Sequence, residues 1–258
     1  MNRPTPFETK PSSPHLATLR GTVDLRLWIH RCQSAGIPIV PSLICPHDIP
    51  IDAILAGTIP AGMGALSSWT ERHLCQLTAS EGRAMWRWSH CAPIEIKAAM
   101  AKPHLPVRIP CPADCLDDER FLSILSECRD AGDIMITTIV RPWIVAAVEA
   151  EFPVEFRVFV TREGSTSTSS YYSQRALSKK WIPFAEKASL MAQLLRRYVP
   201  TDIVFSADFL VTSANEVLFL EGGPMPINGA DPCCLEPDHP FGDGCIALEK
   251  LSFSLSVS

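Results

Sequence analysis

Apolar residues recur at helical spacing in three segments of this chain. Residues 23–33, 117–129 and 181–198 each place a row of large apolar side chains on one face, which predicts an amphipathic helix in each segment. Asp117 is the predicted N-cap of the second helix, and Pro200 ends the third because proline cannot continue a helix.

Glycine and proline interrupt the pattern between the first and second helices. Residues 52–68 contain the turn IPAGMG and are expected to form a loop. Short helices are expected at residues 71–77 and 83–88. Trp86 and Trp88 belong to a small cluster of tryptophans that is expected to lie in the core.

The second half of the chain carries the period of two that is typical of β-strands. Residues 154–160, VEFRVFV, alternate apolar and polar side chains as a half-buried strand does. Residues 205–211 and 216–220 are two apolar runs on either side of a turn at 213–215, which predicts a hairpin. Further strands are expected at residues 134–140 and 165–172.

Composition and charge exclude several classes of protein. The 258 residues are 47% hydrophobic with a net charge of −5, so the chain has a core and no general attraction to nucleic acid or anionic membranes. Residues 1–20, rich in proline, serine and threonine, are expected to be a flexible tail. Because no secretory signal or membrane span is apparent, a cytoplasmic location is expected.

The ten cysteines are spread along the chain and indicate reduced thiols rather than a disulfide framework. The close pairs are Cys111 with Cys115 and Cys233 with Cys234. Two adjacent cysteines suit the regular spacing of a zinc site poorly, so ordinary buried or half-buried thiols are expected.

Two carboxylates of the predicted hairpin stand out against their apolar surroundings. Asp208 interrupts the strand FSADFLV, and Glu221 follows the strand EVLFL. A buried acid is costly unless it is paired or bound to metal, and two oxygen ligands on rigid strands suit Mg²⁺. Alternatively, Asp208 pairs with a buried arginine and Glu221 caps a loop, and the spacing leaves both interpretations open.

Positive charges accompany these acids. Arg157 interrupts the strand at 154–160 and shares a face with Glu155, two residues earlier, so it can bind an anion or form a structural ion pair. Arg141 precedes a proline, which holds it extended, and it can reach phosphate groups or an acidic substrate; a structural ion pair is its alternative. The candidates to line the substrate side follow the polar strand, and an exposed strand end is the alternative; they are Tyr171, Tyr172, Gln174 and Arg175.

The predicted elements of the second half follow one another in a distinctive order. The strand at 134–140 leads to EFRVFV, then to a long helix and then to ADFLV and EVLFLEGGP. In this order the chain resembles the large lobe of the ATP-grasp superfamily over residues 134–235. It is most similar to compact bacterial and phage-associated members, and the EFRVFV run also resembles the eukaryotic cell-cycle branch.

The resemblance implies a fold and a division of the chain. The expected fold class is α/β and ATP-grasp-like, with an antiparallel sheet in the large lobe and a smaller N-terminal α/β lobe. The expected parts are a tail at 1–20, an N-terminal α/β region at 21–90, a small ATP-grasp lobe at 91–139 and a large lobe with a metal site at 140–258.

The resemblance also implies a nucleotide site. Val140, Trp143 and Ile144 would form the hinge whose backbone reads adenine, and Glu155 would contribute from the next strand. Lys97 is the candidate for the family's phosphate-binding lysine. It lies on an apparent helix at residues 93–102, so a solvated surface lysine is the alternative.

The implied metal ligands and catalytic residues are the charged residues of the sheet. Asp208 and Glu221 would bind Mg²⁺ on the nucleotide, and Arg157 and Arg141 would stabilise charge that develops during transfer. The family's usual pattern after the metal glutamate is Glu-x-Asn, whereas this chain has Gly223 at the asparagine position. No clear Gly-rich loop lies between residues 90 and 140.

Two classes of function follow from these expectations. The first is an ATP-dependent ligase that joins a carboxylate to an amine through an acyl phosphate and releases ADP, with small-molecule or peptide substrates. The alternative is a nucleotide-binding regulatory or interaction module without ligase activity, which the missing asparagine and Gly-rich loop favour, or an ATP-dependent phosphotransferase. No nucleic-acid or membrane partner is expected, and the oligomeric state is left open.

Overall fold

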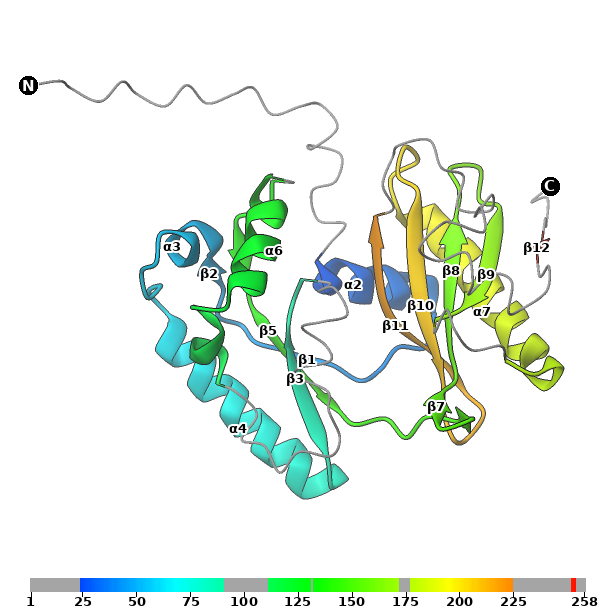
Figure 1. Ribbon diagram of the computed structural model, residues 1–258, viewed down its shortest axis with the longest axis horizontal. Coiled ribbons are helices and arrows are strands. Elements are labelled where there is room, and N and C mark those ends of the chain that lie inside the picture. The colour runs from blue at the N-terminus through cyan, green and yellow to red at the C-terminus, as the bar shows by residue number, and fades with distance from the viewer. Residues whose placement is uncertain (1–23, 91–110, 131, 172–176, 225–251, 254–258) are drawn as a thin grey trace, which may run out of the picture.

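The described part of the chain forms two lobes (Figure 1). The computed structural model describes residues 24–90, 111–130, 132–171, 177–224 and 252–253. The small lobe holds residues 43–88, 112–130 and 132–142, and the large lobe holds residues 155–170, 179–224 and 252–253 together with the helix at residues 25–35.

The large lobe is built on a five-stranded antiparallel sheet with the order β11-β10-β8-β9-β12. β10 and β11 form the predicted hairpin, with Asn215 in the turn. The bounds of the strands are Glu155–Val160 for β8, Thr166–Ser170 for β9, Phe205–Val211 for β10, Val217–Pro224 for β11 and Ser252–Phe253 for β12.

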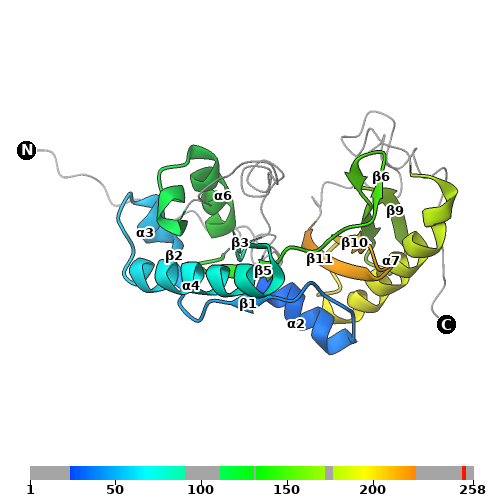
Figure 2. The same ribbon diagram turned by 90° about the horizontal axis from the view of Figure 1, so that it is seen from below.

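Alternation along the strands gives this sheet two different faces. One face is apolar and is covered by α7 (Ile182–Leu195) and α2 (Leu25–Ala35), which Figure 2 shows along one side of β10 and β11. Phe156, Phe209 and Trp28 are fully buried in this core. Because strand side chains alternate, the opposite face carries the polar residues of β8 and β10.

The small lobe has its own apolar core. Trp86 and Trp88 project from the sheet β1-β5-β3 into this core, where Trp88 stacks on Phe121 at 5.0 Å between ring centroids. The strands are β1 (Leu43–Ile44), β2 (Ile49–Pro50), β3 (Ala84–Trp88), β4 (Met135–Ile136) and β5 (Thr138–Pro142). The helices are α3 (Ile51–Leu55), α4 (Met63–Glu81), the short 3₁₀ helix η1 (Pro112–Cys115) and α6 (Glu119–Asp130).

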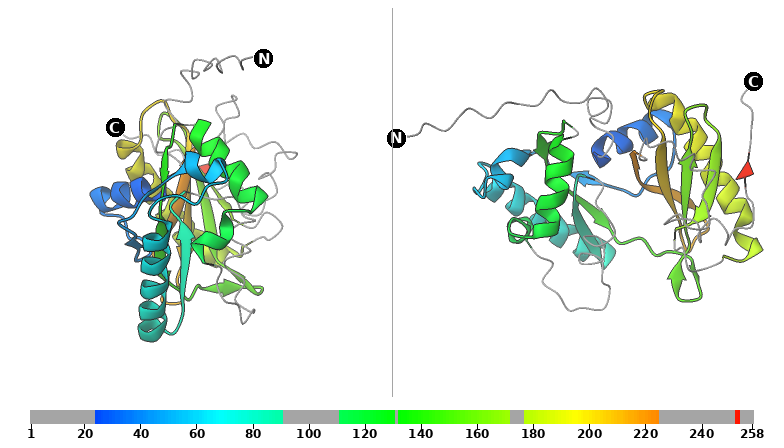
Figure 3. Two further views of the ribbon diagram at one scale, coloured as in Figure 1. Left: turned by 90° about the vertical axis from the view of Figure 1, so that its left-hand side faces the viewer. Right: turned by 45° about the horizontal axis from the view of Figure 1, so that its top comes forward.

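A single extended link leads from β5 to β8, and Figure 3 shows it between the lobes. It contains the hairpin of β6 (Val148–Glu149) and β7 (Phe152–Pro153). Two 3₁₀ helices, η2 (Lys179–Trp181) and η3 (Arg196–Tyr198), flank α7.

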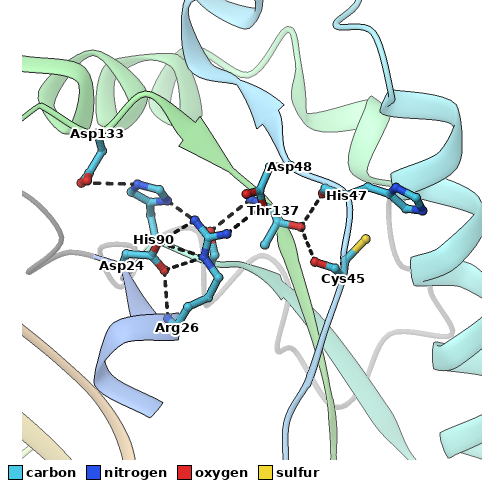
Figure 4. A network of polar contacts seen from close by, with 9 residues as sticks. Asp24, Arg26, Cys45, His47, Asp48, His90, Asp133 and Thr137 are labelled. Atoms are coloured by element: carbon cyan, nitrogen blue, oxygen red, sulfur yellow. Dashed lines mark hydrogen bonds and ion pairs between the residues drawn. The ribbon is translucent and has the colours of Figure 1, made fainter. Parts of the chain in front are cut away.

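Helix α2 contacts both lobes. Its apolar face packs on β11, whereas its N-terminal end belongs to a polar network with residues of the small lobe (Figure 4). Asp24 caps the helix by accepting from the backbone N–H of Arg26, and the Arg26 guanidinium lies 2.7 Å from Asp48. His90 forms a backbone bridge with Asp24, and its Nε2 lies 3.5 Å from Asp133. This network fixes the large-lobe helix to the end of β3.

Most of the elements predicted from periodicity are confirmed, and three predictions in the small lobe are wrong. Of residues 52–68, which were expected to form a loop, 52–55 belong to α3 and 63–68 to the first part of α4, with a turn between them. The helix expected at 71–77 is confirmed as part of α4. Residues 83–88 form strand β3 rather than a helix. The N-cap of α6 is Asp118 rather than Asp117, because the Asp118 carboxylate accepts from the N–H of Phe121.

The predicted α/β fold class, with an antiparallel sheet in the larger lobe, is confirmed. The tail at 1–20, the apparent helix at 93–102 and the substrate-side candidates at 172–175 lie outside the described residues. Within the described ranges, Cys32, Cys45, Cys75, Cys111, Cys115 and Cys128 are free thiols. No helix of the described ranges combines the length and apolar character that a membrane span requires.

Candidate functional site

A buried ion pair joins the two central strands of the large sheet. Asp208 of β10 lies directly opposite Arg157 of β8, so both side chains project from the polar face. Arg157 donates from Nε to Oδ1 and from Nη2 to Oδ2 of Asp208, each at 2.7 Å. Burial alone would lower the pKa of Arg157, but the Asp208 charge and hydrogen bonds outweigh it and raise this pKa above its ordinary value. The guanidinium is therefore held firmly as a cation.

A second ion pair joins the two lobes. Glu221 of β11 lies directly opposite Asp208 on the polar face, at a position where the β10–β11 ladder carries a bulge. Arg87 of β3 donates from Nη1 to Oε2 of Glu221 at 2.8 Å, and both residues are buried. The Arg87 guanidinium also donates to the backbone carbonyl of His90. The two acids of the sheet therefore lie side by side, and each has an arginine partner.

Arg141 reaches the same strand from the small lobe. Register places Arg141 opposite Met85, so Arg141 and Arg87 share one face of the small sheet. Arg141 donates from Nη1 to the backbone carbonyl of Leu220 at 3.0 Å and from Nε to Ser42 Oγ at 2.9 Å. The face of the small sheet that carries these arginines thus meets β11 next to Glu221.

Tyr171 and Glu155 complete the described polar face around Arg157. The guanidinium carbon of Arg157 lies 4.8 Å from the ring centroid of Tyr171, a cation–π contact. Burial and, after it, the charge of Asp208 raise the pKa of the Tyr171 phenol to about 12. Glu155 is half-buried two residues before Arg157 on the same strand, as the alternation predicted.

The predicted hinge residues lie in two different settings. Val140 is buried in β5, the middle strand of its sheet, and is paired with Leu43 on one side and Trp86 on the other. Trp143 and Ile144 follow the strand and are half-buried at the start of the link between the lobes. The Trp143 N–H donates to a backbone carbonyl of the small lobe, that of residue 83. Their role in binding adenine stays a prediction.

Lys97 lies outside the described residues, so its part in phosphate binding also stays a prediction. The other predicted charged residues are brought together. Arg157, Asp208 and Glu221 lie in neighbouring positions on three adjacent strands, and Arg141 approaches the same edge from the other lobe.

The carboxylates of Asp208 and Glu221 are suitable ligands for a magnesium ion if they give up their hydrogen bonds to Arg157 and Arg87. Asp208 and Glu221 offer carboxylate oxygens from rigid, adjacent strands, which is the donor type that Mg²⁺ takes. Both oxygens of Asp208 accept from Arg157, and Oε2 of Glu221 accepts from Arg87. Within the described ranges no group of three or more His, Cys, Asp or Glu side chains is arranged to hold a metal ion.

Arg87 is the functional candidate that the sequence interpretation missed. It is the one charged residue in the strand AMWRW, and it was assigned to a helix, where an isolated arginine lies on a solvated face. In a strand, the same residue shares a face with Met85 and opposes the tryptophan face, which would have indicated a sheet surface turned away from the core.

No protein-family model matches this chain. No curated protein matches it either. Solved structures do resemble it in fold, at low sequence identity. Cdc123 from Schizosaccharomyces pombe is similar with a TM-score of 0.54 and 14% identity, over 80% of this chain and 84% of that one.

Two larger proteins give lower TM-scores. N5-carboxyaminoimidazole ribonucleotide synthetase from Thermotoga maritima has a TM-score of 0.43 and 14% identity, over 84% of this chain and 45% of its own. D-alanine-D-alanine ligase from Coxiella burnetii has a TM-score of 0.38 and 15% identity, over 80% of this chain and 48% of its own. This chain thus spans about half the length of these two proteins. At such identities the likeness concerns the fold alone.

Proposed function

We propose that this protein binds ATP with Mg²⁺ at the charged row of Arg157, Asp208, Glu221 and Arg87, and that it is an ADP-forming ligase that joins a carboxylate to an amine. The single observation that carries the proposal is this row of two acids and two arginines, which lies where the sheet of the large lobe meets the small lobe. Acids supply ligands for a cation and arginines supply partners for phosphate, so one row serves both halves of a magnesium nucleotide.

The chain's own residues would position and neutralise the reacting groups. Asp208 and Glu221 would hold the metal, which when bound supplies positive charge beside the phosphate oxygens. Arg157 and Arg141 would donate to oxygens on which negative charge develops during transfer. Since Arg157 and Arg141 belong to different lobes, a substrate between them would be oriented from two sides.

The proposed reaction has two steps. An oxygen of the acceptor carboxylate attacks the γ-phosphorus of ATP, the bond to the β-phosphate oxygen breaks, and ADP leaves. The amine nitrogen then attacks the carbonyl carbon of the acyl phosphate, inorganic phosphate leaves with the C–O bonding pair, and the nitrogen loses a proton. The substrates would be small molecules or a peptide.

The first test is a thermal-shift titration with Mg²⁺ and ATP, ADP or GTP, since a ligand that binds the folded state raises the apparent melting temperature. ATP with Mg²⁺ should stabilise the wild type, and Asp208→Asn and Glu221→Gln should remove the shift. These variants keep the volume of each side chain, whereas alanine would leave a buried arginine without this partner. Asp48→Asn, which removes a similar charge from the Arg26 ion pair, should bind as the wild type does.

A product assay then tests the ligase step. Mixtures of carboxylic acids and amines with Mg²⁺ and ATP should release ADP and form an amide that mass spectrometry detects. Retained turnover in both Asp208→Asn and Glu221→Gln would refute the assignment of these residues. A phosphorylated acceptor in place of an amide would identify a phosphotransferase instead.

A nucleotide-binding module without ligase activity is the second candidate. The observation that favours it is that both acids already have arginine partners, while Gly223 stands where the superfamily pattern has an asparagine. Nucleotide binding without ADP release in any acceptor mixture would support it. The narrower likeness to bacterial and phage-associated members, and the cytoplasmic location, stay predictions.

A further inference from the structure

The charged row is neutralised from its two ends by arginines of different origin. Along the row the order is Arg157, Asp208, Glu221, Arg87, so the two acids are central and each arginine flanks one acid. Arg157 comes from the neighbouring strand of the same sheet, whereas Arg87 comes from the small lobe. Each acid thus has a cation on its outer side and another acid on its inner side.

The adjacent acids account for the arginine partner that each of them has. Asp208 and Glu221 are cross-strand partners and are buried, 3% and 6% exposed, so their charges repel each other where water screens them poorly. The arginines offset this repulsion. A divalent cation would do the same, but it would also repel the two guanidinium groups that already hold the carboxylates.

A polyphosphate alone meets the opposite difficulty. Its negative charges would attract Arg87 and Arg157, but drawing these arginines away would leave Asp208 and Glu221 beside each other and beside the incoming anion. Only a cation and a polyphosphate together satisfy all four residues, since the acids then take the cation and the arginines take the phosphate oxygens.

We infer that the site takes a divalent cation and a polyphosphate only as a pair, through an exchange of partners in which Arg87 and Arg157 leave their carboxylates for phosphate. This inference rests on the proposed function and adds that the binding of the cation and the binding of the polyphosphate depend on each other. Neither component binds well alone, and each raises the affinity for the other by the same factor, as linked binding requires. The exchange also breaks the Arg87–Glu221 ion pair that connects β3 to β11.

Removing one arginine should separate the two halves of the exchange. Arg87→Gln removes the cation that donates to Oε2 of Glu221, so the variant should bind Mn²⁺ without any nucleotide. Arg157→Gln should do the same by removing the cation that donates to Asp208. Mn²⁺ is the probe because its binding is read from water-proton relaxation without catalysis. We expect a gain in Mn²⁺ affinity of about tenfold or more, a size common for coupled sites.

The controls separate this effect from a general loss of positive charge. Arg26→Gln removes an arginine that pairs with Asp24 and Asp48 outside the row, and it should not gain Mn²⁺ binding. Arg87→Lys keeps the charge and should behave as the wild type. Circular dichroism melting would verify that each variant is folded, and Arg157→Gln provides the test if Arg87→Gln does not fold.

Three outcomes decide the matter. The exchange is supported by three results together. The wild type does not bind Mn²⁺ alone, either arginine-to-glutamine variant gains Mn²⁺ affinity, and Mg²⁺ with ATP stabilises the wild type. Equal Mn²⁺ affinity in the wild type and the variants would overturn the exchange, while binding of Mg²⁺ with ATP would leave the proposed function standing. Absence of any effect of Mg²⁺ with ATP on the wild type would overturn the proposed function itself.

Discussion

The Arg87 guanidinium and the Glu221 carboxylate lie 2.8 Å apart and connect β3 of the small lobe to β11 of the large lobe. Their side chains are 10% and 8% exposed, so the pair is shielded from water. A buried pair of this kind contributes little relative to two apolar residues, but the loss of one partner is costly because the other charge is left behind. The relative position of the lobes and the charge state of the row thus depend on the same contact.

Removal of one member of this pair should destabilise the protein more than removal of both. Arg87→Met is expected to lower the free energy of unfolding by about 3 kcal/mol, and the double variant Arg87→Met/Glu221→Leu should recover most of this loss. Urea denaturation of the four members of the cycle measures the coupling. Arg26→Met, which removes a more exposed ion pair, should cost about 1 kcal/mol or less. Equal losses in the single and double variants would contradict the prediction.

Tyr171 should remain protonated in the folded protein well above the pH at which a free phenol ionises. Burial, and then the charge of Asp208, raise its pKa from 10.0 to about 12. Because the unfolded chain loses this proton first, the stabilisation is complete below pH 10 and is lost as the pH rises toward 12. The difference in tyrosinate absorbance between the wild type and Tyr171→Phe gives the pKa. Asp208→Asn should lower it, and an unchanged value would contradict the assigned cause.

The large lobe was predictable because its strands carry a strict local pattern. VEFRVFV alternates, so periodicity identified β8 and placed Arg157 on a polar face. FSADFLV identified β10 as an apolar run in which Asp208 stands out. The structure then pairs Asp208 with Arg157, as one of the two interpretations of Asp208 had it. Local sequence cannot decide between an arginine and a metal as partner, because either removes the cost of burying the acid.

The small lobe was predicted less well because its signals are weak or non-local. In the 19-residue helix α4 only Met63, Leu66 and Thr70 are buried, so the apolar stripe is too narrow to identify the helix after a Gly-rich turn. The five-residue strand β3 is too short to distinguish from a helical turn by period. The partner of Arg87 lies 134 residues further along the chain, a contact that no local pattern encodes.

Substitutions in the turn of the β6–β7 hairpin are expected to stabilise the protein. Ala150 and Glu151 have φ values of 49° and 72°, the left-handed region that both central residues of a type I′ turn require and that asparagine and glycine tolerate best. Ala150→Asn/Glu151→Gly should raise the free energy of unfolding by about 1 kcal/mol. At Asn215, where φ is 63°, the residue type already suits the left-handed region. Asn215→Ala should therefore lower the free energy of unfolding.

The two glycines after Glu221 should differ in how strongly they respond to substitution. A Cβ on Gly222 would lie 2.8 Å from the ring of Trp28, which is fully buried between α2 and the sheet. Gly222→Ala should therefore displace α2 and cost about 1–3 kcal/mol, as overpacking does. A Cβ on Gly223 would meet no atom within 4 Å in the part of the chain described, so Gly223→Ala should be close to neutral.

Gly223 is also where an added ligand should strengthen metal and nucleotide binding. It lies two residues after Glu221 and opposite Ser206, so an asparagine there would project from the same face as the two acids. Gly223→Asn should fold as well as Gly223→Ala does and should increase the thermal shift with Mg²⁺ and ATP, because an amide oxygen joins the two carboxylates. A shift no larger than that of Gly223→Ala, in a variant whose melting temperature without ligand is unchanged, would show that this position does not face the bound metal.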